Sequence, residues 1–344
     1  MSGTSLDGVD IALVRFDLQG EEYSFEIIKA DTFAYSEEMQ VRLLNCRSLS
    51  NDLLIELHND WACFVGELIN LEFLQQGFQI DLIASHGHTV FHQPKAGLTL
   101  QIGSLEQLLA LTNVPTVGDF RALDVAKGGE GAPLVPIGDR LLFKSHGACL
   151  NLGGIANISF EEAGERVAFD VAPCNLLLNY LAKKVGKPYD EDGQLAFEGA
   201  VNKKLLSQLN SINLYLQKDR PSLGIEYIEE HFYPLLDQSS LPIEQIMRTC
   251  VVHIAIKIAK SVPSSERVLL SGGGAFNKCL IKEIQQQGVA VELPSSSIIN
   301  FKEALIFAFL GLRRVENKIN VLKSVTGANS NSCAGQYFEA DVQG

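Results

Sequence analysis

The chain has 344 residues, of which 46% are apolar and 20% are charged, and its formal net charge is −13. This balance is typical of a soluble globular enzyme and excludes a disordered chain. The acidic charge, without any block of Lys and Arg, argues against nucleic acid as a partner. The length exceeds one ordinary hydrophobic core, so we expect two domains with a ligand cleft between them.

Seven scattered cysteines form no C-x-x-C pair, which is typical of free thiols in a reducing cytosol. The N-terminus shows no basic region followed by an apolar stretch, so we expect no signal peptide. The longest strongly apolar stretch, 304–312, is far shorter than the roughly 20 residues that span a bilayer. We therefore expect a cytoplasmic protein without a membrane partner.

The first predicted elements are a glycine-rich loop at 1–10 and an alternating apolar strand at 11–16. Glycines permit the positive φ of a tight turn, hydroxyls add donors, and carboxylates can order the water around Mg²⁺. We expect this loop to bind a nucleotide triphosphate. Its candidate cofactor-binding residues are Gly3, Thr4, Ser5, Leu6, Asp7, Gly8, Val9 and Asp10.

Helices are predicted at 37–45 and 52–75, and a strand at 82–84 then leads into His86 and His88. Two His residues two positions apart point the same way in a strand, which invites a zinc site. No further ligand set stands at a zinc spacing, so we prefer hydrogen bonding to a polar substrate.

After a predicted helix at 105–111, the segment 117–124 places Asp119 and Arg121 close together. The guanidinium fork of Arg binds both oxygens of a carboxylate, so Arg121 is a candidate for a substrate carboxylate. A buried structural ion pair is the alternative.

A strand at 148–152 opens a second glycine turn, with Asn151, Gly153 and Gly154 as candidates, and apolar residues on both sides predict strand, turn and strand. The next strand, 167–170, ends in Asp170. A carboxylate at a strand end can act as a general base or can cap a turn or helix, and the sequence supports both interpretations equally.

Helices at 175–185 and 243–261 precede a strand at 268–270 and a third turn of Gly272, Gly273 and Gly274. This turn leads into a helix at 275–287 that contains Asn277, and we expect it to lie against adenosine. This third turn lacks the glycine spacing of a dinucleotide-binding fingerprint. The first loop does not match a P-loop, because it has Val9 and Asp10 where a P-loop needs Lys and Ser or Thr.

The last predicted helix, 302–316, has Glu303 at its start, either as an N-terminal charge or as a hydrogen-bond acceptor in a cleft. We expect the chain to cross between domains near 120 and to return near 315. The predicted domains are 1–120 plus 316–344, and 121–315. The predicted fold class is α/β.

Several segments together resemble the anhydro-N-acetylmuramic acid kinases of bacterial cell-wall recycling. They occur in order over essentially the whole chain: 1–10, 85–89, 118–136, 151–159, 169–175, 189–199, 270–277, 303–310 and 325–328. The resemblance implies the actin-like ATPase fold of sugar kinases and Hsp70, with two RNase H-like lobes that close on ATP and Mg²⁺. It also implies a possible homodimer.

The resemblance further implies that the 1,6-anhydro sugar is opened by water while O6 takes the γ-phosphoryl group of ATP, giving N-acetylmuramic acid 6-phosphate and ADP. Asp170 matches the catalytic base. His86, Asp119, Arg121 and Glu303 match positions near the sugar, and Asp7 is expected to reach Mg²⁺ through water.

The chain departs from the family pattern at Val171, Ala172 and Cys174 beside the base, at His88, and in the segment 220–226. These changes leave two alternatives open: a catalytically impaired ATP-binding homologue, or a kinase of another amino sugar. The family also has an aliphatic strand before the first loop. We expect that Met1 is not the natural start and that the first strand of the lobe is truncated.

Overall fold

The structure is a computed structural model and describes residues 1–3, 6–212, 214, 223–263 and 266–339. Thr4 and Ser5 of the first loop, and 220–222 of the altered segment, lie outside the described residues. The chain forms two compact units, Met1–Leu142 with Glu303–Gly344, and Phe143–Lys302. The chain therefore leaves the first unit later, and returns earlier, than the expected crossings near 120 and 315.

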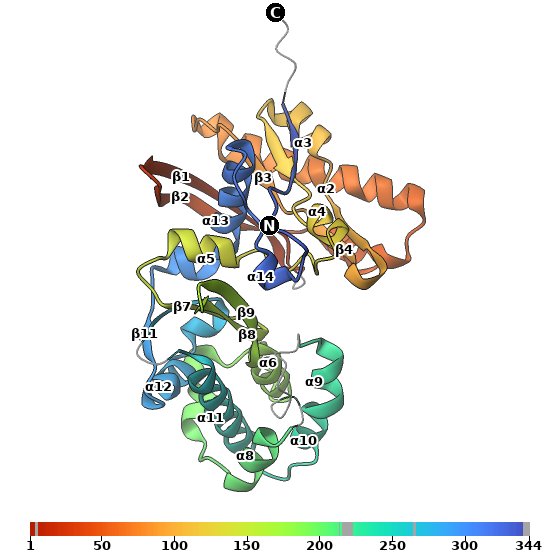
Figure 1. Cartoon of the computed structure of the whole chain (residues 1–344). Helices are drawn as coiled ribbons and strands as arrows, with labels where there is room; N and C mark the ends of the chain where they lie inside the picture. The colour runs from red at the N-terminus through yellow and green to blue at the C-terminus, as the bar shows by residue number, and fades with distance from the viewer. Residues whose placement is uncertain (4–5, 213, 215–222, 264–265, 340–344) are drawn as a thin grey trace, which may run out of the picture. The chain divides into compact units, whose positions relative to one another are not determined.

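The first unit is an α/β arrangement of short sheets and helices (Figure 1). Its elements are β1 (Gly8–Gln19), β2 (Glu22–Ala34), α1 (Glu37–Leu44), α2 (Asn51–Glu72), β3 (Ile83–Ser85), β4 (His88–Gln93), β5 (Leu98–Ile102), α3 (Leu105–Thr112), β6 (Thr116–Gly118), α4 (Ala122–Ala126), α5 (Pro136–Leu142), α14 (Lys323–Thr326) and β12 (Gln336–Phe338).

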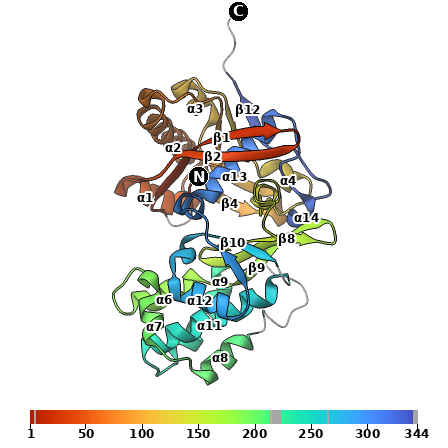
Figure 2. The same ribbon diagram turned by 90° about the vertical axis from the view of Figure 1, so that its left-hand side faces the viewer.

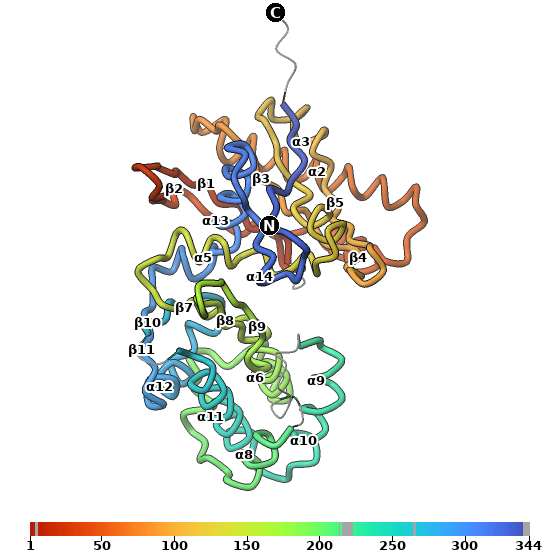
Figure 3. Tube along the Cα trace, viewed as in Figure 1, coloured from red at the N-terminus to blue at the C-terminus, as the bar shows by residue number. Residues whose placement is uncertain are grey.

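Three sheets are assigned among the described residues of this unit. β1 and β2 form an antiparallel hairpin, β3 lies parallel and β12 antiparallel to β6, and β4 pairs antiparallel with β5. The hairpin β1–β2 lies on one side of the unit beside α13 (Ser296–Val315), as Figure 2 shows. Its tip projects away from the helices of the unit (Figure 3).

The second unit contains one five-stranded sheet in the order β11-β10-β7-β8-β9. Its strands are β7 (Ala148–Leu152), β8 (Ile155–Glu162), β9 (Glu165–Pro173), β10 (Arg267–Ser271) and β11 (Ala290–Glu292). Its helices are α6 (Asn175–Lys183), α7 (Gln194–Glu198), α8 (Lys203–Asn210), α9 (Ile225–His231), α10 (Tyr233–Asp237), α11 (Ile243–Ser261) and α12 (Lys278–Gln286).

The core of this unit joins the sheet to α6 and α11. Met247, Val251, Ile254 and Ile258 recur on one face of α11 and are fully buried, because a period of three to four residues keeps them on the same side. The predicted helix at 243–261 and the predicted strand-turn-strand at 151–159 are confirmed.

The predicted helix start at 302 is confirmed, and the one at 275 is wrong. α13 begins at Ser296 but joins two helices across a kink at Phe301, whose φ of −115° is not helical, so Glu303 lies at the start of the second helix, as predicted. α12 begins at Lys278 because Asn277 caps it, and the residues before it form a short 3₁₀ helix, Gly273–Phe276. Within the described residues, no helix has both the length and the apolar composition needed to cross a bilayer.

Candidate functional site

The first glycine loop folds back on the start of β1. The amino group of Met1 donates to the carbonyl of Asp10 at 2.8 Å, and the amide of Asp10 donates to the carbonyl of Met1 at 2.9 Å. Ser2 forms an antiparallel bridge with Val9. The loop is therefore closed by a short piece of β-ladder, which holds Leu6 and Asp7 at its turn.

The prediction that Gly8 has a positive φ is wrong, and Leu6 instead has the left-handed conformation at φ 55°. Gly8 is the first residue of β1 and pairs with Ala34. A Cβ there would overlap the carbonyl oxygen of Phe33, so Gly8 is needed for close approach of two backbones.

Asp7 and Asp10 have different environments. Asp7 is exposed, whereas Asp10 is half-buried and its Oδ1 accepts from the hydroxyl of Thr32 at 2.6 Å. Burial raises the pKa of Asp10, and the hydrogen bond from Thr32 opposes this. Asp7 is therefore the more accessible of the two carboxylates.

A buried polar network holds Ser2. Its Oγ lies 2.9 Å from Nδ1 of His88 and accepts from the hydroxyl of Tyr35 at 2.7 Å, and Trp61 donates to the same Tyr35 oxygen at 3.0 Å. Burial lowers the pKa of His88. His88 therefore holds the first loop from within the protein.

His86 and Arg121 are joined by two side-chain contacts. Arg121 Nε and Nη2 lie 3.0 Å and 2.8 Å from Nε2 of His86, and Nη1 donates to the carbonyl of Gly131 at 2.6 Å. Because Nε2 accepts, the ring proton lies on Nδ1 and is donated to the carbonyl of Gly87, 3.1 Å away. Burial and the charge of Arg121 hold the pKa of His86 well below its usual range.

The loop that carries Gly131 depends on Asp124, which the sequence analysis did not single out. Asp124 is completely buried, and its two carboxylate oxygens accept from the Gly131 amide and from the Thr326 hydroxyl, each at 2.8 Å. A Cβ at Gly129 would overlap the Asp124 carboxylate. The only sequence signal was that Asp124 and Thr326 lie in two of the matching segments, 118–136 and 325–328.

Asp119 and Glu303 are the other two residues that were predicted to bind the sugar. Asp119 follows β6 with φ 54°, a strained conformation for a residue with a side chain, and its carboxylate accepts from Gln336 at 2.9 Å. Glu303 is exposed. Burial lowers the pKa of both Arg121 and the Met1 amine, and the negative charge of Glu303 partly opposes this lowering. Glu303 therefore lies near Arg121 and the first loop.

In the second unit, Asp170 lies on β9 beside a β-bulge. Asn157 of β8 pairs with Asp170 and Ala156 pairs with Ala172, so Val171 is the extra residue. Bulges of this kind turn a side chain out of the regular alternation. Asp170 is half-buried, and its Oδ2 accepts from the amide of Leu223 at 2.8 Å.

The three departures beside Asp170 all place their side chains in the core. Val171 is 5% exposed, and Ala172 and Cys174 are completely buried. Burial raises the pKa of the Cys174 thiol to about 12, so the sulfur is an inert apolar group. None of these three side chains is accessible beside the Asp170 carboxylate.

The second glycine turn lies at the N-terminus of α6. The carbonyls of Gly153 and Gly154 accept from the amides of Asn175 and Cys174, respectively. Among the described residues, no backbone acceptor is assigned to the amides of Gly153 and Gly154. Neighbouring free amides of this kind form an anion-binding nest.

The third turn, Gly272 to Gly274, packs against the end of β7. A Cβ at Gly272 or Gly274 would lie 2.9 Å or 2.8 Å from the backbone of Leu152, and Gly272 has φ 79°. Gly273 is exposed, and the nearest atom to a Cβ at this position would be 3.9 Å away. Two of the three glycines are thus required by packing, and one is open to a ligand.

Three Asn residues bear on these turns, and the sequence analysis proposed two of them, Asn151 and Asn277, as ligands. Asn175, which the sequence analysis did not propose as a site residue, donates to the carbonyl of Leu152 at 3.0 Å and lies against Gly273 and Gly274. It therefore joins the second and third turns. Asn277 caps α12 by accepting from Leu280, and Asn151 accepts from Ser271 at 3.5 Å, so both side chains also have structural uses.

A sequence model of the family described as "Anhydro-N-acetylmuramic acid kinase" matches residues 1–340. The protein of that name from Haemophilus influenzae is 33% identical, with 99% of this chain and 97% of that protein covered. The one from Chromobacterium violaceum is 34% identical, with 98% and 97% covered. A ROK family glucokinase structure from Streptomyces griseus, in complex with glucose and AMPPNP, has a TM-score of 0.40 and 10% identity, covering 88% of this chain and 99% of that one.

The family model and the two relatives identify a phosphotransferase. The chain belongs to the anhydro-N-acetylmuramic acid kinase family.

Proposed function

We propose that this protein is an ATP-dependent kinase that opens 1,6-anhydro-N-acetylmuramic acid with water and phosphorylates O6, giving N-acetylmuramic acid 6-phosphate and ADP. The observation that carries this proposal is Asp170, a half-buried carboxylate on β9, the strand that leads into α6, whose N-terminus lies at the second glycine turn. The reaction belongs to peptidoglycan recycling, in the cytoplasm.

In this reaction the accepting oxygen is part of an ether and has no proton to lose. Asp170 would instead take a proton from water, and the resulting hydroxide would attack the anomeric carbon. As the bond from this carbon to O6 breaks, O6 receives the γ-phosphoryl group. The proton ends on Asp170, and phosphorylation prevents O6 from closing the bridge again.

The glycine turns fit a nucleotide. The amides of Gly153 and Gly154 and the exposed Gly273 offer N–H groups and space of the kind that phosphate and adenosine need. No group of three His, Cys, Asp or Glu side chains suited to a metal is found in the part of the chain that the structure describes. Mg²⁺, which supplies charge neutralisation when bound, would be held by phosphates and water, with the exposed Asp7 beyond its water shell.

The sugar would be bound by His86, Asp119, Arg121 and Glu303. After its bonds to His86 and Gly131, the Arg121 guanidinium retains two of its five N–H groups, one on each terminal nitrogen. Burial lowers the pKa of Arg121 to about 10, so it stays charged at neutral pH. These two donors suit the carboxylate of the lactyl group.

The buried positions of Val171, Ala172 and Cys174 favour the active kinase over an impaired homologue, because all three changes add apolar groups to the core. Specificity for another amino sugar is the second candidate. It rests on the segment 220–226, of which the structure describes 223–226.

The test is ADP release in ¹⁸O-water with the anhydro sugar as acceptor. We expect one ADP per sugar phosphate and the label at C1 of the product. Phosphorylation without label would contradict the hydrolytic mechanism. ATP binding without turnover would favour the impaired homologue, and faster turnover of a free hexosamine would favour the second candidate.

A further inference from the structure

The strand β12 follows a segment that a buried amide holds in place. Asn320 is completely buried, and its side chain exchanges two hydrogen bonds with Ala334: Nδ2 donates to the carbonyl at 2.8 Å, and Oδ1 accepts from the amide at 2.6 Å. Nδ2 also donates to the carbonyl of Leu310 in α13 at 3.0 Å. Because a buried amide without these partners would be costly, Ala334 stays fixed to α13.

The next residue, Gly335, sets the direction in which the chain enters β12. Its φ is 120°, a conformation that favours glycine, and Arg314 Nε donates to its carbonyl at 2.7 Å. A Cβ at this position would lie 3.0 Å from Cγ1 of Val117 and 3.3 Å from Cε1 of Phe120. The backbone at Gly335 therefore lies close to β6, and this packing leaves it little room to move.

The register of β12 brings Gln336 to the end of β6. Gln336 pairs with Gly118, the last residue of β6, and Asp119 follows directly. Gln336 is exposed, and its Nε2 donates to Oδ2 of Asp119 at 2.9 Å. Within the described residues, Oδ1 accepts only from the amide of Ala122, at 3.4 Å. The contact with Gln336 is thus the shorter of the two that hold this carboxylate.

The backbone around Asp119 makes such a contact useful. The φ of Asp119 is 54°, a strained conformation that persists only where the surroundings enforce it. Gly118 before it has no room for a side chain, because a Cβ there would lie 2.6 Å from Leu105 and 2.8 Å from the carbonyl oxygen of Ser85. A neutral amide donor orients the carboxylate and leaves its negative charge in place, so Oδ1 can still accept from a hydroxyl or an N–H group.

We propose that Gln336 is a positioning residue for the sugar, which holds Oδ2 of Asp119 so that Oδ1 accepts from a hydroxyl or from the acetamido N–H of the substrate. This inference rests on the proposed function, in which Asp119 contacts the sugar. Because Ala334 and Gly335 fix the start of β12, the carboxylate is oriented before the sugar binds, which lowers the entropic cost of binding.

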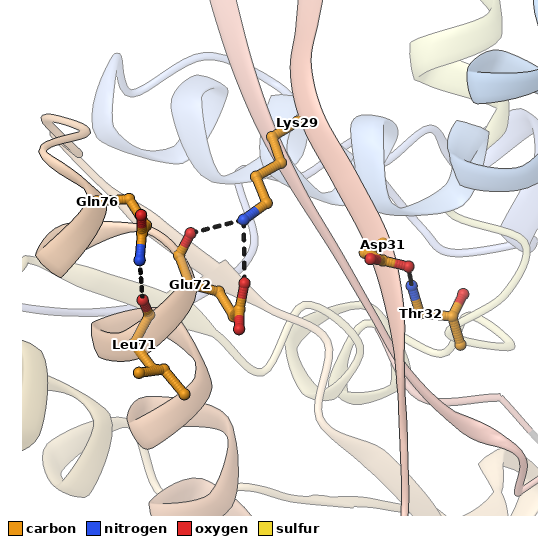
Figure 4. Close-up of polar contacts among 6 residues, drawn as sticks. All are labelled: Lys29, Asp31, Thr32, Leu71, Glu72 and Gln76. Carbon is orange, nitrogen blue, oxygen red and sulfur yellow. Dashed lines mark hydrogen bonds and ion pairs between the residues drawn. The ribbon is translucent and has the colours of Figure 1, made fainter.

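The first test is Gln336→Met, which keeps the length of the side chain and removes the donor. We expect KM for the anhydro sugar to rise about 3- to 10-fold, with kcat and KM for ATP within about twofold of the native values, because an exposed hydrogen bond contributes modestly. The matched control is Gln76→Met, since Gln76 is also exposed and its Nε2 donates to the carbonyl of Leu71 at 3.3 Å, as Figure 4 shows. This control should keep the native constants. A native KM for the sugar in Gln336→Met would overturn the proposal.

A double-mutant cycle tests whether Gln336 acts through Asp119. Asp119→Gly removes the carboxylate, and glycine suits the positive φ at this position. If Gln336 acts only through this carboxylate, Gln336→Met should change KM for the sugar by less than about twofold in the Asp119→Gly protein. A KM of the double variant that equals the product of the two separate fold-changes would show independent effects and would contradict the proposal.

Hydrogen exchange of the side-chain amides, followed by NMR, tests the contact without turnover. Asp119→Gly should accelerate exchange at Nε2 of Gln336 by about threefold or more and leave exchange at Gln76 unchanged. Equal exchange at Gln336 with and without the carboxylate would overturn the proposal. The kinetics also separate this inference from the proposed function. Turnover of the anhydro sugar with a native KM in Gln336→Met would remove this inference alone, whereas an absence of turnover in the native protein would remove both.

Discussion

The guanidinium of Arg121 donates to Nε2 of His86 through two of its nitrogens, at 3.0 Å and 2.8 Å, and this fixes the ring as a neutral tautomer with its proton on Nδ1. Arg121 is therefore held from both sides, by His86 and by the Gly131 carbonyl. A side chain fixed in this way can receive a carboxylate without first being ordered, which lowers the entropic cost of binding.

Arg121→Lys should raise KM for the anhydro sugar by about 10- to 100-fold, because Lys lacks the planar fork that contacts His86, Gly131 and a carboxylate together. The effect on kcat should be smaller. Steady-state kinetics with varied sugar and saturating ATP measure both constants. Arg15→Lys, in an exposed pair with Glu26, is the control. An unchanged KM would remove Arg121 from sugar binding.

Thr326→Val should lower the free energy of unfolding by about 1–2 kcal/mol, because it removes the hydroxyl that donates to the buried Asp124 carboxylate while keeping the shape. Since Asp124 also holds the Gly131 loop, KM for the sugar should rise with little change in KM for ATP. Thr326→Ser keeps the hydroxyl and is the control. Urea unfolding and kinetics of both variants check this, and identical behaviour of Val and Ser would argue against the network.

Single Gly-to-Ala substitutions in the third turn should distinguish a glycine that is needed for packing from one that is open to the nucleotide. Gly272→Ala should lower Tm, because its Cβ meets the backbone of Leu152 and its φ is positive. Gly273→Ala should leave Tm almost unchanged but raise KM for ATP several-fold, since this position is open. Thermal unfolding and ATP titrations distinguish the two effects. A native KM for ATP in Gly273→Ala would exclude that position from the nucleotide site.

Asp170→Asn should lower kcat by about 10³-fold or more, because an amide cannot take a proton from water. Its carbonyl oxygen can still accept from Leu223, so we expect a native Tm. Both ADP and the sugar phosphate should disappear together. Asp237→Asn, at an exposed carboxylate, is the control. If either product persists at the native rate, Asp170 is not the base.

Stability should fall as the pH is lowered below about 6.5, and His253 should account for part of this. Burial lowers the pKa of His253 to about 3, so the unfolded chain binds more protons than the folded one between these two pH values. The loss at pH 5 should be roughly 2 kcal/mol, from about 1.5 pH units at 1.4 kcal/mol each. Urea unfolding at pH 5 and pH 7.5 measures it. His253→Gln should flatten the decline, and an unchanged slope in this variant would contradict the assignment.

Local sequence patterns were sufficient for the elements whose determinants lie close together in the chain. The strand-turn-strand around Gly153 and Gly154 and the buried face of α11 follow from apolar patterns within about 20 residues. The strand β2 was not predicted, because it lies in a half-exposed hairpin and mixes charged with apolar residues. The helix predicted from 302 matches the part of α13 after the kink at Phe301, whereas the part from Ser296 to the kink was not predicted because it carries Ser and Asn rather than a continuous apolar stripe.

The tertiary structure decided what each candidate residue can do. Thr326 and Asp124 are 202 positions apart, and their hydrogen bond fixes a loop whose carbonyl orients Arg121. A sequence pattern records no partner at such a separation. The side chains of Val171, Ala172 and Cys174 point to the core because of the fold of β9, a direction that the residue types alone leave open. The amino acids thus determined which chemistry was available and where glycine was needed, and packing decided which of those groups remain free to act.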